Sequence, residues 1–314
     1  MRLQDLMRDR RVLVTGGAGF IGSHLVEVLS ERNKVFVYDD LSTGRLSNLD
    51  DLDAELVVGS LSDLDLLQRT CKGMDYVFHL AAIPSVPRSI DDPAGSNIAN
   101  QNGTLNALIA ARDCHVTRLV YSSSSSVYGD TPTLPKHEDM MPDPLSPYAV
   151  SKLAGEYYCK VFTRVYRLPT VSLRFFNVFG PRQDPRSQYA AVIPKFIAQA
   201  REGKRLTVTG DGTQTRDFTY VLDAVQGLIR AALTDKGDGQ VLNVARGDRV
   251  ELNRLAADIL AAFGRVLDDG VEHIAPRPGD ILHSQADIGR ARALLGYEPQ
   301  FTVRQGLDMT IGAL

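Results

Sequence analysis

Residues 11–22 read RVLVTGGAGFIG, a short apolar run followed directly by a cluster of glycines and then by an amphipathic segment. Gly16, Gly19 and Gly22 are spaced GxxGxxG within this stretch. Glycines in such a turn let the backbone approach a pyrophosphate, which then meets the positive N-terminus of the helix that follows. Glycine-rich turns are common, but a position after a strand and before a helix favours a dinucleotide-binding turn.

A second signal lies about twenty residues further on, the usual spacing for such a turn. There the next apolar run ends in Asp39 and Asp40. A carboxylate at this place accepts hydrogen bonds from the ribose diol of adenosine and repels a 2′-phosphate. Asp39 therefore favours NAD over NADP, and the alternative is an aspartate that only caps the following turn.

Strand and helix patterns alternate through the first half of the chain. Short β-branched runs are typical of buried parallel strands, and the longer segments between them have helical periodicity. The strands are expected at 11–15, 34–39, 55–59, 75–80, 118–123 and 170–176, and helices at 20–32, 98–114 and 146–166. This order predicts an α/β fold with a Rossmann-type doubly wound parallel sheet.

The pattern changes after Asn177, where GPRQDPRSQY is followed by shorter elements. We therefore expect two domains, an NAD-binding Rossmann domain over 1–177 and a smaller C-terminal α/β domain over 178–314 that binds the substrate. The segment 216–245 is a candidate to pack back onto the first domain.

Composition excludes several classes of protein. A net charge of −3 offers no basic surface for nucleic acid, and no apolar run approaches the ~18 residues that a membrane helix needs. Three cysteines without a CxxC or Cys/His cluster predict neither a metal site nor a disulfide framework. With a charged N-terminus unlike a signal peptide, these features favour a cytoplasmic protein.

The heptapeptide SPYAVSK at 146–152 places a tyrosine and a lysine four residues apart. Ser146 before Pro147 is typical of a helix start, with serine as N-cap and proline at the first position. On that helix Tyr148 and Lys152 share one face, about one turn apart. Taken alone, this pattern favours a surface helix over a functional pair.

The motifs taken in order resemble the extended short-chain dehydrogenase/reductase family. They are the glycine turn, the acidic strand end, SSSSSVYG at 122–129 and the Tyr148-x3-Lys152 pair. The chain looks most like the nucleotide-sugar 4-epimerases, especially those that act on UDP-N-acetylglucosamine. The resemblance extends over HLAA (79–82), SVPRS (85–89), LRFFNVFGPRQDP (173–185), GDGTQTRDFTYV (210–221) and RPGD (277–280).

The resemblance implies a role for each matching residue. Tyr148 would take the proton from a sugar hydroxyl, Lys152 would favour the phenolate and hold the nicotinamide ribose, and Ser124 would bond the reacting oxygen. The implied NAD-binding residues are Gly16, Gly19, Phe20, Ile21, Gly22, Asp39, Asp40, Leu41, Ser42, Thr43, Gly44, Leu80, Ala81, Ala82, Ser122, Tyr148, Lys152 and Phe176. The implied substrate-binding residues are Ser85, Val86, Ser124, Ser125, Ser126, Tyr148, Asn177, Val192, Arg216, Arg277, Asp280 and Ser284.

Within the second set the resemblance assigns Arg216 and Arg277 to the diphosphate and Asp280 to the nucleotide ribose. Val192 and the strand around 207–209 would border the uracil. Relatives often carry an aspartate after the third strand to touch adenine, whereas this chain has Ser60 there. An adenine contact at that position is therefore not predicted.

The implied reaction is an NAD-dependent inversion at C4 of a UDP-hexose through a transient 4-keto intermediate, with NAD retained throughout. Ser125 and Ser126 stand where dehydratases carry Asp and Glu and where decarboxylases keep a Glu, so those reactions lack their acid/base groups. Ser284 stands at a position that gates the sugar pocket, and its small side chain leaves room for an acetamido group. This predicts UDP-GlcNAc/UDP-GalNAc as substrates, with UDP-Glc/UDP-Gal also accepted.

Several alternatives stay open. Asp184 stands where UDP-glucuronate epimerases place an arginine, which argues against that substrate, because an anionic side chain repels a carboxylate. A UDP-glucuronate 4-epimerase, a strict UDP-glucose 4-epimerase, a reductase that releases NADH and a non-enzymatic NAD-binding regulator are the other possibilities. The family also implies a homodimer, formed by a four-helix bundle of helices near 98–112 and 148–166.

Overall fold

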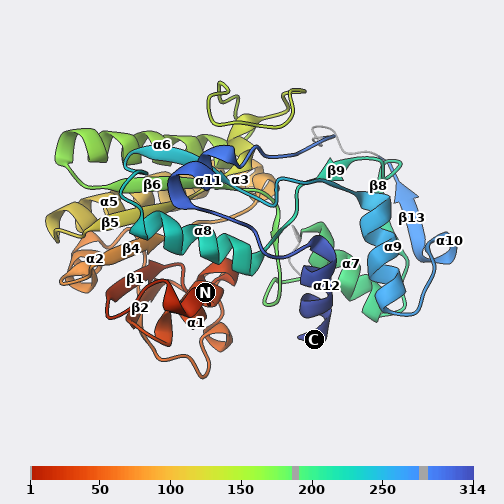
Figure 1. The fold of residues 1–314 in the computed structure, drawn as a ribbon, viewed down its shortest axis with the longest axis horizontal. Helices are drawn as coiled ribbons and strands as arrows, with labels where there is room; N and C mark the ends of the chain where they lie inside the picture. Colours follow the sequence, from red (N-terminus) through yellow and green to blue (C-terminus); the bar gives the residue numbers. More distant parts are fainter. Residues whose placement is uncertain (1, 186–190, 276–281) are drawn as a thin grey trace.

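The computed structural model describes residues 2–185, 191–275 and 282–314 of the 314-residue chain. Its main feature is a seven-stranded, all-parallel sheet with the order β11-β6-β5-β4-β1-β2-β3 (Figure 1). The strands are β1 Arg11–Thr15, β2 Lys34–Asp39, β3 Ala54–Val58, β4 Tyr76–His79, β5 Arg118–Ser124, β6 Thr170–Phe175 and β11 Gln240–Val244. The predicted fold class, a doubly wound parallel sheet, is confirmed.

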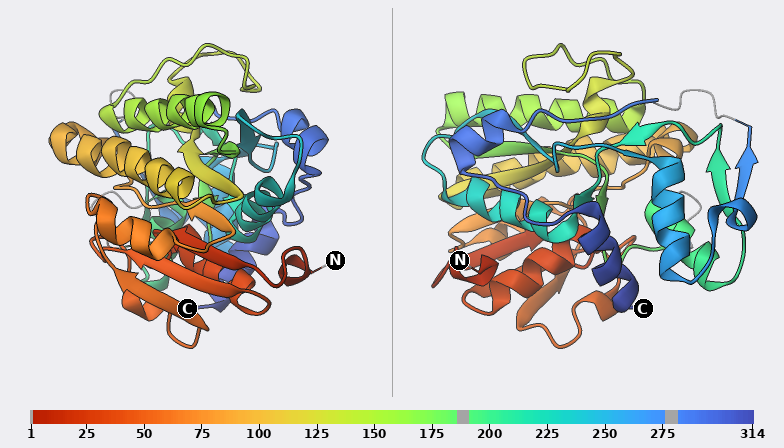
Figure 2. Two further views of the ribbon diagram at one scale, coloured as in Figure 1. Left: turned by 90° about the vertical axis from the view of Figure 1, so that its left-hand side faces the viewer. Right: turned by 45° about the vertical axis from the view of Figure 1, so that its right-hand side comes forward.

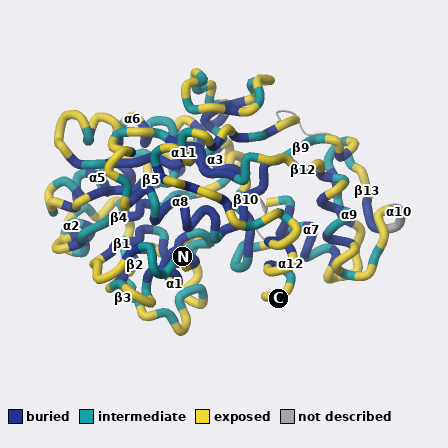
Figure 3. Tube along the Cα trace, in the orientation of Figure 1, coloured by how far each residue is buried: buried dark blue, intermediate teal, exposed yellow. Residues whose placement is uncertain are grey.

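Two layers of helices cover the sheet. The layers lie on opposite faces, since each packs its apolar side chains into a separate cluster of buried residues (Figure 2). One layer consists of α1 Phe20–Ser30, α8 Val221–Leu233 and α11 Gly289–Leu295, and the other of α2 Leu64–Cys71, α5 Gly103–Asp113 and α6 Pro147–Tyr166. Figure 3 shows the central strands buried and the outer surfaces of the helices exposed.

The strand order reverses between β1 and β4. From β1 the chain moves outward to β2 and β3 on one side, and from β4 it moves to β5 and β6 on the other. Ligands of open parallel sheets bind at such a switch point, in the crevice outside the carboxyl ends of the strands. This topology therefore places the binding crevice beside Gly16 and Leu80, the residues that follow β1 and β4.

The structure differs from the sequence prediction in two elements. The helix expected over 98–114 is preceded by two short helices, α3 Val86–Asp91 and α4 Pro93–Asn97, and itself opens with a π-helical turn at Ile98–Asn102. The seventh strand, β11, pairs in parallel with β6, and α8 packs against β5 and β6. The chain thus returns to the main sheet after residue 215.

A smaller body packs beside the carboxyl ends of the strands, on the right in Figure 1. Its core contains Phe196, Leu206, Ile259 and Val271. It consists of α7 Val192–Arg201, β8 Leu206–Thr209, α9 Leu252–Ala262, α10 Leu267–Gly270, β13 Val271–Ile274 and α12 Val303–Gly312. Short strand pairs join it to the main sheet: β7 Val178–Phe179 with β10 Thr219–Tyr220, and β9 Thr215–Arg216 with β12 Val250–Glu251.

No helix within the described ranges is both long and apolar enough to cross a bilayer.

Candidate active site

The glycine turn between β1 and α1 is closed so tightly that side chains cannot enter it. Gly16 has a positive φ of 73°, and a Cβ atom there would lie 2.6 Å from the backbone nitrogen of Ala81. A Cβ atom at Gly22 would lie 2.1 Å from the carbonyl oxygen of Gly16. Glycines therefore let this turn pack closely, and Gly16, Gly19 and Gly22 line a cavity at the start of α1, the position that a pyrophosphate site requires.

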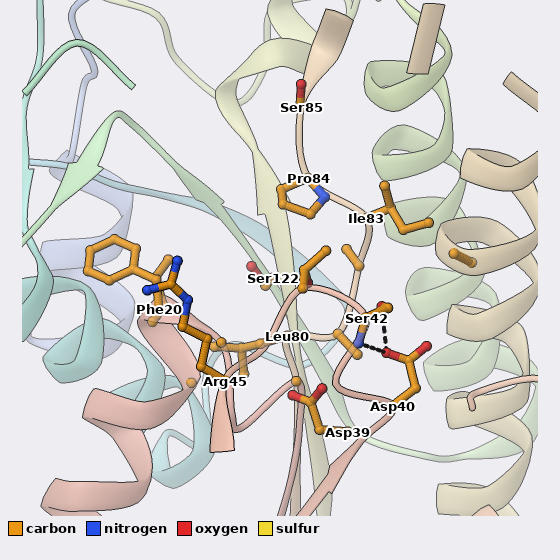
Figure 4. Close-up of a pocket in the computed structure, with 18 of the residues that line it drawn as sticks. Phe20, Asp39, Asp40, Ser42, Arg45, Leu80, Ile83, Pro84, Ser85 and Ser122 are labelled. Atoms are coloured by element: carbon orange, nitrogen blue, oxygen red, sulfur yellow. Dashed lines mark hydrogen bonds between the residues drawn. The ribbon is translucent and has the colours of Figure 1, made fainter. Parts of the chain in front are cut away.

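Asp39 ends β2 with its carboxylate held in place by two backbone donors. Oδ2 accepts from the N–H of Ala18 at 3.0 Å and Oδ1 from that of Leu41 at 2.9 Å. Burial raises the pKa of Asp39 and these two bonds oppose the shift. Both oxygens keep further acceptor capacity, which suits a ribose diol. The neighbouring Asp40 turns away to accept two hydrogen bonds from Ser42 (Figure 4).

A cavity of about 640 Å³ runs along the carboxyl ends of the strands from this aspartate to α6. Most of the predicted NAD-binding residues line it, and Figure 4 shows several of them around the space. They are Gly16, Gly19, Phe20, Ile21, Gly22, Asp39, Asp40, Ser42, Thr43, Leu80, Ala81, Ala82, Ser122, Tyr148 and Lys152. Leu41 and Gly44 belong to the same loop but not to the lining, and Phe176 lines a second cavity instead.

Sequence reasoning missed several residues of this lining. Asn48 lines the cavity and its Nδ2 donates to the carbonyl of Ala18 at 2.8 Å, which ties the loop after β2 to the glycine turn. Ser60 also lines the cavity, and its carbonyl accepts from the hydroxyl of Tyr38 at 2.8 Å.

Arg45 and Asp184 form an ion pair at 2.5 Å in the cofactor cavity lining, although they lie far apart in sequence. Asp184 is absent from the second cavity's lining, and its charge is compensated by Arg45. The sequence argument that Asp184 would repel a sugar carboxylate is therefore not supported by its position.

Helix α6 begins as its sequence predicted. Ser146 is the N-cap, its Oγ accepts from the N–H of Ala149 at 3.1 Å, and Pro147 is the first helical residue. The next residue, Tyr148, donates its backbone N–H to Ser89 Oγ of α3 at 3.0 Å. The start of α6 is thus fixed against the segment that follows β4.

Lys152 lies one turn along α6 and points back toward the end of β5. Its Nζ donates to the carbonyl of Ser122 at 2.7 Å and lies 5.8 Å from the ring centre of Tyr148. Burial lowers the pKa of Lys152 to about 8. Burial raises the pKa of Tyr148, and a hydrogen bond with Ser124 opposes that shift. The structure therefore brings together the predicted tyrosine, lysine and serine.

One turn further along α6, a buried ion pair supports this arrangement. Glu156 Oε2 accepts from Arg174 of β6 at 2.7 Å, and Glu156 Oε1 accepts from Ser123 Oγ at 2.6 Å. Ser123 is 3% exposed and belongs to β5, within the strand expected over 118–123. These bonds lock the end of β5, which carries Ser122 and Ser124, against α6.

A second cavity of about 500 Å³ adjoins the first, and Tyr148 lines both. Most predicted substrate-binding residues line it: Ser85, Val86, Ser124, Ser125, Ser126, Tyr148, Asn177, Arg216 and Ser284. Val192 opens α7 beside Ala191, which lines both cavities, but is not itself part of either lining. Arg277 and Asp280 lie outside the described residues.

A doubly wound dinucleotide-binding fold carries Tyr148 at the junction of two cavities, with Lys152 lining the first cavity and Ser124 the second. This combination is typical of NAD-dependent enzymes that use a tyrosine as the acid or base. The chain belongs to the NAD dependent epimerase/dehydratase family, whose model matches residues 12–245.

Individual relatives match nearly the whole chain. A UDP-glucose 4-epimerase of Mycolicibacterium smegmatis is 39% identical over 308 residues, which is 96% of this chain and 97% of the relative. The structure of a UDP-N-acetylglucosamine 4-epimerase of Methanobrevibacter ruminantium, in complex with UDP-N-acetylmuramic acid, is 41% identical, has a TM-score of 0.94 and covers 98% of both chains. That of a UDP-glucuronic acid 4-epimerase of Bacillus cereus, with UDP-glucuronic acid and NAD, is 32% identical, has a TM-score of 0.88 and covers 96% of this chain and 98% of that one.

NAD is the cofactor of this family, and the residues of the first cavity fit it. Gly16 and Gly22 line the cavity at the start of α1, where a pyrophosphate would bind, and Asp39 offers oxygens to a ribose. Lys152, which lines the same cavity and contacts Ser122, would hold the nicotinamide ribose.

Proposed function

We propose that this chain is a UDP-hexose 4-epimerase that keeps NAD tightly bound and inverts C4 through a transient 4-keto sugar. One observation carries the proposal: Tyr148 lines both cavities, with Lys152 on the cofactor side and Ser124 on the substrate side. A base between a dinucleotide space and a sugar space suits removal of a hydroxyl proton at the carbon that is oxidised.

The chain's own groups then have defined roles. Tyr148 takes the proton of the C4 hydroxyl, and Ser124, bonded to Tyr148, holds the reacting oxygen. The ammonium of Lys152 favours the phenolate electrostatically. NAD, held by the residues of the first cavity, would supply hydride removal and return at C4. Arg216 holds the diphosphate by guanidinium geometry, so that the sugar turns about a fixed nucleotide.

The serines at the end of β5 support epimerisation over elimination. Ser125 and Ser126 line the second cavity, and no carboxylate belongs to that lining in the described part of the chain. Water elimination needs a further acid and base at the sugar. Retention of the 4-keto group until hydride returns is therefore the favoured outcome.

We propose UDP-GlcNAc/UDP-GalNAc as the main substrate pair, with UDP-Glc/UDP-Gal also accepted. Ser284 lines the second cavity with a small side chain, which supports space for an acetamido group. A UDP-glucuronate 4-epimerase is the second candidate, favoured by the pairing of Asp184 with Arg45 at the cofactor cavity.

Two further assignments belong to this proposal. The NAD-binding part is residues 1–177 together with the returning elements α8 and β11, and the rest of 178–314 binds the UDP-sugar. A homodimer is supported by an apolar stripe on the exposed face of α6, formed by Val150, Tyr157, Val161 and Val165, which are 45–65% exposed. Light scattering of the purified protein measures that assembly directly.

The activity is tested by mixing purified protein with UDP-GlcNAc and no added NAD. Formation of UDP-GalNAc supports the proposal, because the retained cofactor is regenerated in each turnover. A strict requirement for added NAD with release of NADH would indicate a reductase. Absence of any epimer from UDP-GlcNAc, UDP-Glc and UDP-glucuronate would reject the proposed function.

A further inference from the structure

The second cavity carries a cation that the proposed mechanism does not use. Lys136 lines this cavity although it comes from the proline-rich loop before α6, and it is only 2% exposed. Lys136 and Arg216 are the charged residues of the lining among the described residues. Arg216 serves the diphosphate in the proposed mechanism, so Lys136 is left for another part of the substrate.

Backbone hydrogen bonds connect both Lys136 and Thr215, the residue before Arg216, to one segment that contains Ser284. The amide of Ser284 donates to the carbonyl of Thr215, which precedes Arg216, at 3.1 Å. One residue on, the carbonyl of Gln285 accepts from the amide of Lys136 at 2.8 Å. The segment at 284–285 is thus bonded at one residue to the neighbour of Arg216 and at the next to Lys136, so both cations come from chain segments that adjoin Ser284, the proposed sugar gate.

The ammonium of Lys136 has donors to spare. It donates to the carbonyl of Thr131, and an ammonium has three N–H donors in all. No carboxylate of the described residues lies within 4.0 Å of it as an ion-pair partner. Burial lowers its pKa, and the charge of Asp130 opposes that shift. A lysine is seldom buried without an acidic partner, because desolvation of the charge is costly.

A neighbouring donor in the same cavity is also unused. The hydroxyl oxygen of Ser126 is buried and makes no hydrogen bond to any described residue. Ser126 lines the cavity together with Lys136 and Gly129. An ammonium and a hydroxyl that belong to one cavity lining suit an oxygen anion, since both can donate to it.

From this arrangement we infer that Lys136 binds a carboxylate carried by the hexose, so that acidic UDP-hexoses are substrates of the same site. The inference rests on the proposed UDP-hexose activity and deepens it. Two kinds of sugar carry such a carboxylate: a hexuronate at C6, or a hexose with a lactyl ether at C3.

The test compares matched pairs of substrates that differ in the carboxylate. UDP-glucose is paired with UDP-glucuronate for the C6 position, and UDP-GlcNAc with UDP-N-acetylmuramate for the lactyl ether. For each pair the acid-to-neutral ratio of binding constants is measured by calorimetry, and that of kcat/KM by product analysis. The variants are Lys136→Met and Lys136→Arg, with the exposed Lys236→Met as a control that removes a lysine outside both linings.

In the wild type, at least one acid is expected to bind as tightly as its neutral partner or more tightly. For that acid, Lys136→Met should lower the acid-to-neutral ratio of association constants by about tenfold or more. This is the usual effect of losing a hydrogen bond to a charged group. Lys136→Arg should restore part of it, and Lys236→Met should leave it unchanged. The pair that responds identifies where the carboxylate lies.

Two results overturn the inference without touching the proposed function. One is a wild type that turns over neutral UDP-hexoses but binds both acids more than tenfold more weakly. The other is a Lys136→Met variant that loses acid and neutral substrates equally, as expected if Lys136 only ties down the loop at Thr131. A wild type that epimerises neither neutral nor acidic sugars instead rejects the proposed function itself.

Discussion

Lys152 donates to the carbonyl of Ser122 at 2.7 Å while its nitrogen lies 5.8 Å from the ring centre of Tyr148. The lysine therefore connects the cofactor side of the β5 end to the helix that carries the phenol. Because Lys152 is almost fully buried, its charge acts on Tyr148 through a medium of low polarity, where electrostatic effects are stronger than in water.

Tyr148→Phe should lower kcat by about a hundredfold or more, the lower range for loss of a positioned acid or base. Phenylalanine keeps the ring and loses only the proton-accepting oxygen. UDP binding and the amount of NAD that copurifies are expected to persist, as measured by calorimetry and absorbance. Turnover near the wild-type rate would show that another group takes the proton.

Ser284→Tyr should reduce kcat/KM for UDP-GlcNAc more than for UDP-Glc. Ser284 is 9% exposed and lines the sugar cavity, so a phenol there occupies space that the acetamido group needs. Ser284→Ala is the matched control, because it removes the hydroxyl without filling the cavity. An equal loss for both sugars in the tyrosine variant would argue that Ser284 does not select between them.

Arg45→Gln and Asp184→Asn should each speed the release of NAD about two- to fivefold. The ion pair joins two segments of the cofactor cavity lining. Because both side chains are partly exposed, the pair contributes about 1 kcal/mol or less to the stability of this contact. The rate is measured by NADH fluorescence with an unlabelled competitor. The double variant should release NAD no faster than either single variant, since one interaction is lost in each case.

An exposed pair on α9 supplies the control for that experiment. Arg254 and Asp258 also form an ion pair, at 3.1 Å, but neither lines a cavity. Arg254→Gln should leave the release rate unchanged. Equal acceleration in this variant would mean that general destabilisation, not the Arg45–Asp184 contact, controls release.

His79 makes stability depend on pH. Thr15 Oγ1 lies 2.7 Å from Nδ1 and Thr104 Oγ1 lies 3.0 Å from Nε2, and burial lowers the pKa of His79 to about 3. In the unfolded chain the histidine takes up a proton near pH 6.5, whereas in the folded chain it stays neutral until about pH 3. The contribution of His79 to the free energy of unfolding is therefore complete above pH 6.5 and is lost as the pH falls toward 3. Between pH 7 and 5 the loss from this group is about 2 kcal/mol.

His79→Gln should be less stable at pH 7 but should lose about 2 kcal/mol less than the wild type between pH 7 and 5. Glutamine has no charge to gain over this range. The measurement is the free energy of unfolding by denaturant at each pH with NAD in excess. Parallel pH profiles for the two proteins would assign the acid sensitivity to other groups.

The main sheet was predictable because its signals are local. The run RVLVT and the glycine turn after it specify a strand and a phosphate-binding turn within a dozen residues. Likewise, Ser146 and Pro147 define the start of α6 by capping geometry alone. The order of the Tyr148 and Lys152 motif along the chain then indicated the family.

Features that depend on distant contacts were not predictable. The motif around Asp184 predicted an uncompensated negative charge, but Asp184 forms an ion pair with Arg45, which lies in the loop after β2 and far away in the sequence. Lys136 lies in a proline-rich loop, where a lysine is expected to be exposed, and its burial follows from pairing with the segment at Gln285. Ser123 lies within the expected strand, but nothing in the serine run distinguishes it locally, and its bond to Glu156 depends on the packing of α6.

The most direct test of the central claim follows the hydrogen at C4. UDP-GlcNAc carrying deuterium at C4 is incubated in ordinary water with the purified protein and no added NAD, and the product is analysed by NMR. The account predicts UDP-GalNAc that retains the deuterium at the inverted C4, because the same hydride leaves and returns while Tyr148 handles only the hydroxyl proton. Exchange of that deuterium for solvent hydrogen, with epimer still formed, would contradict it.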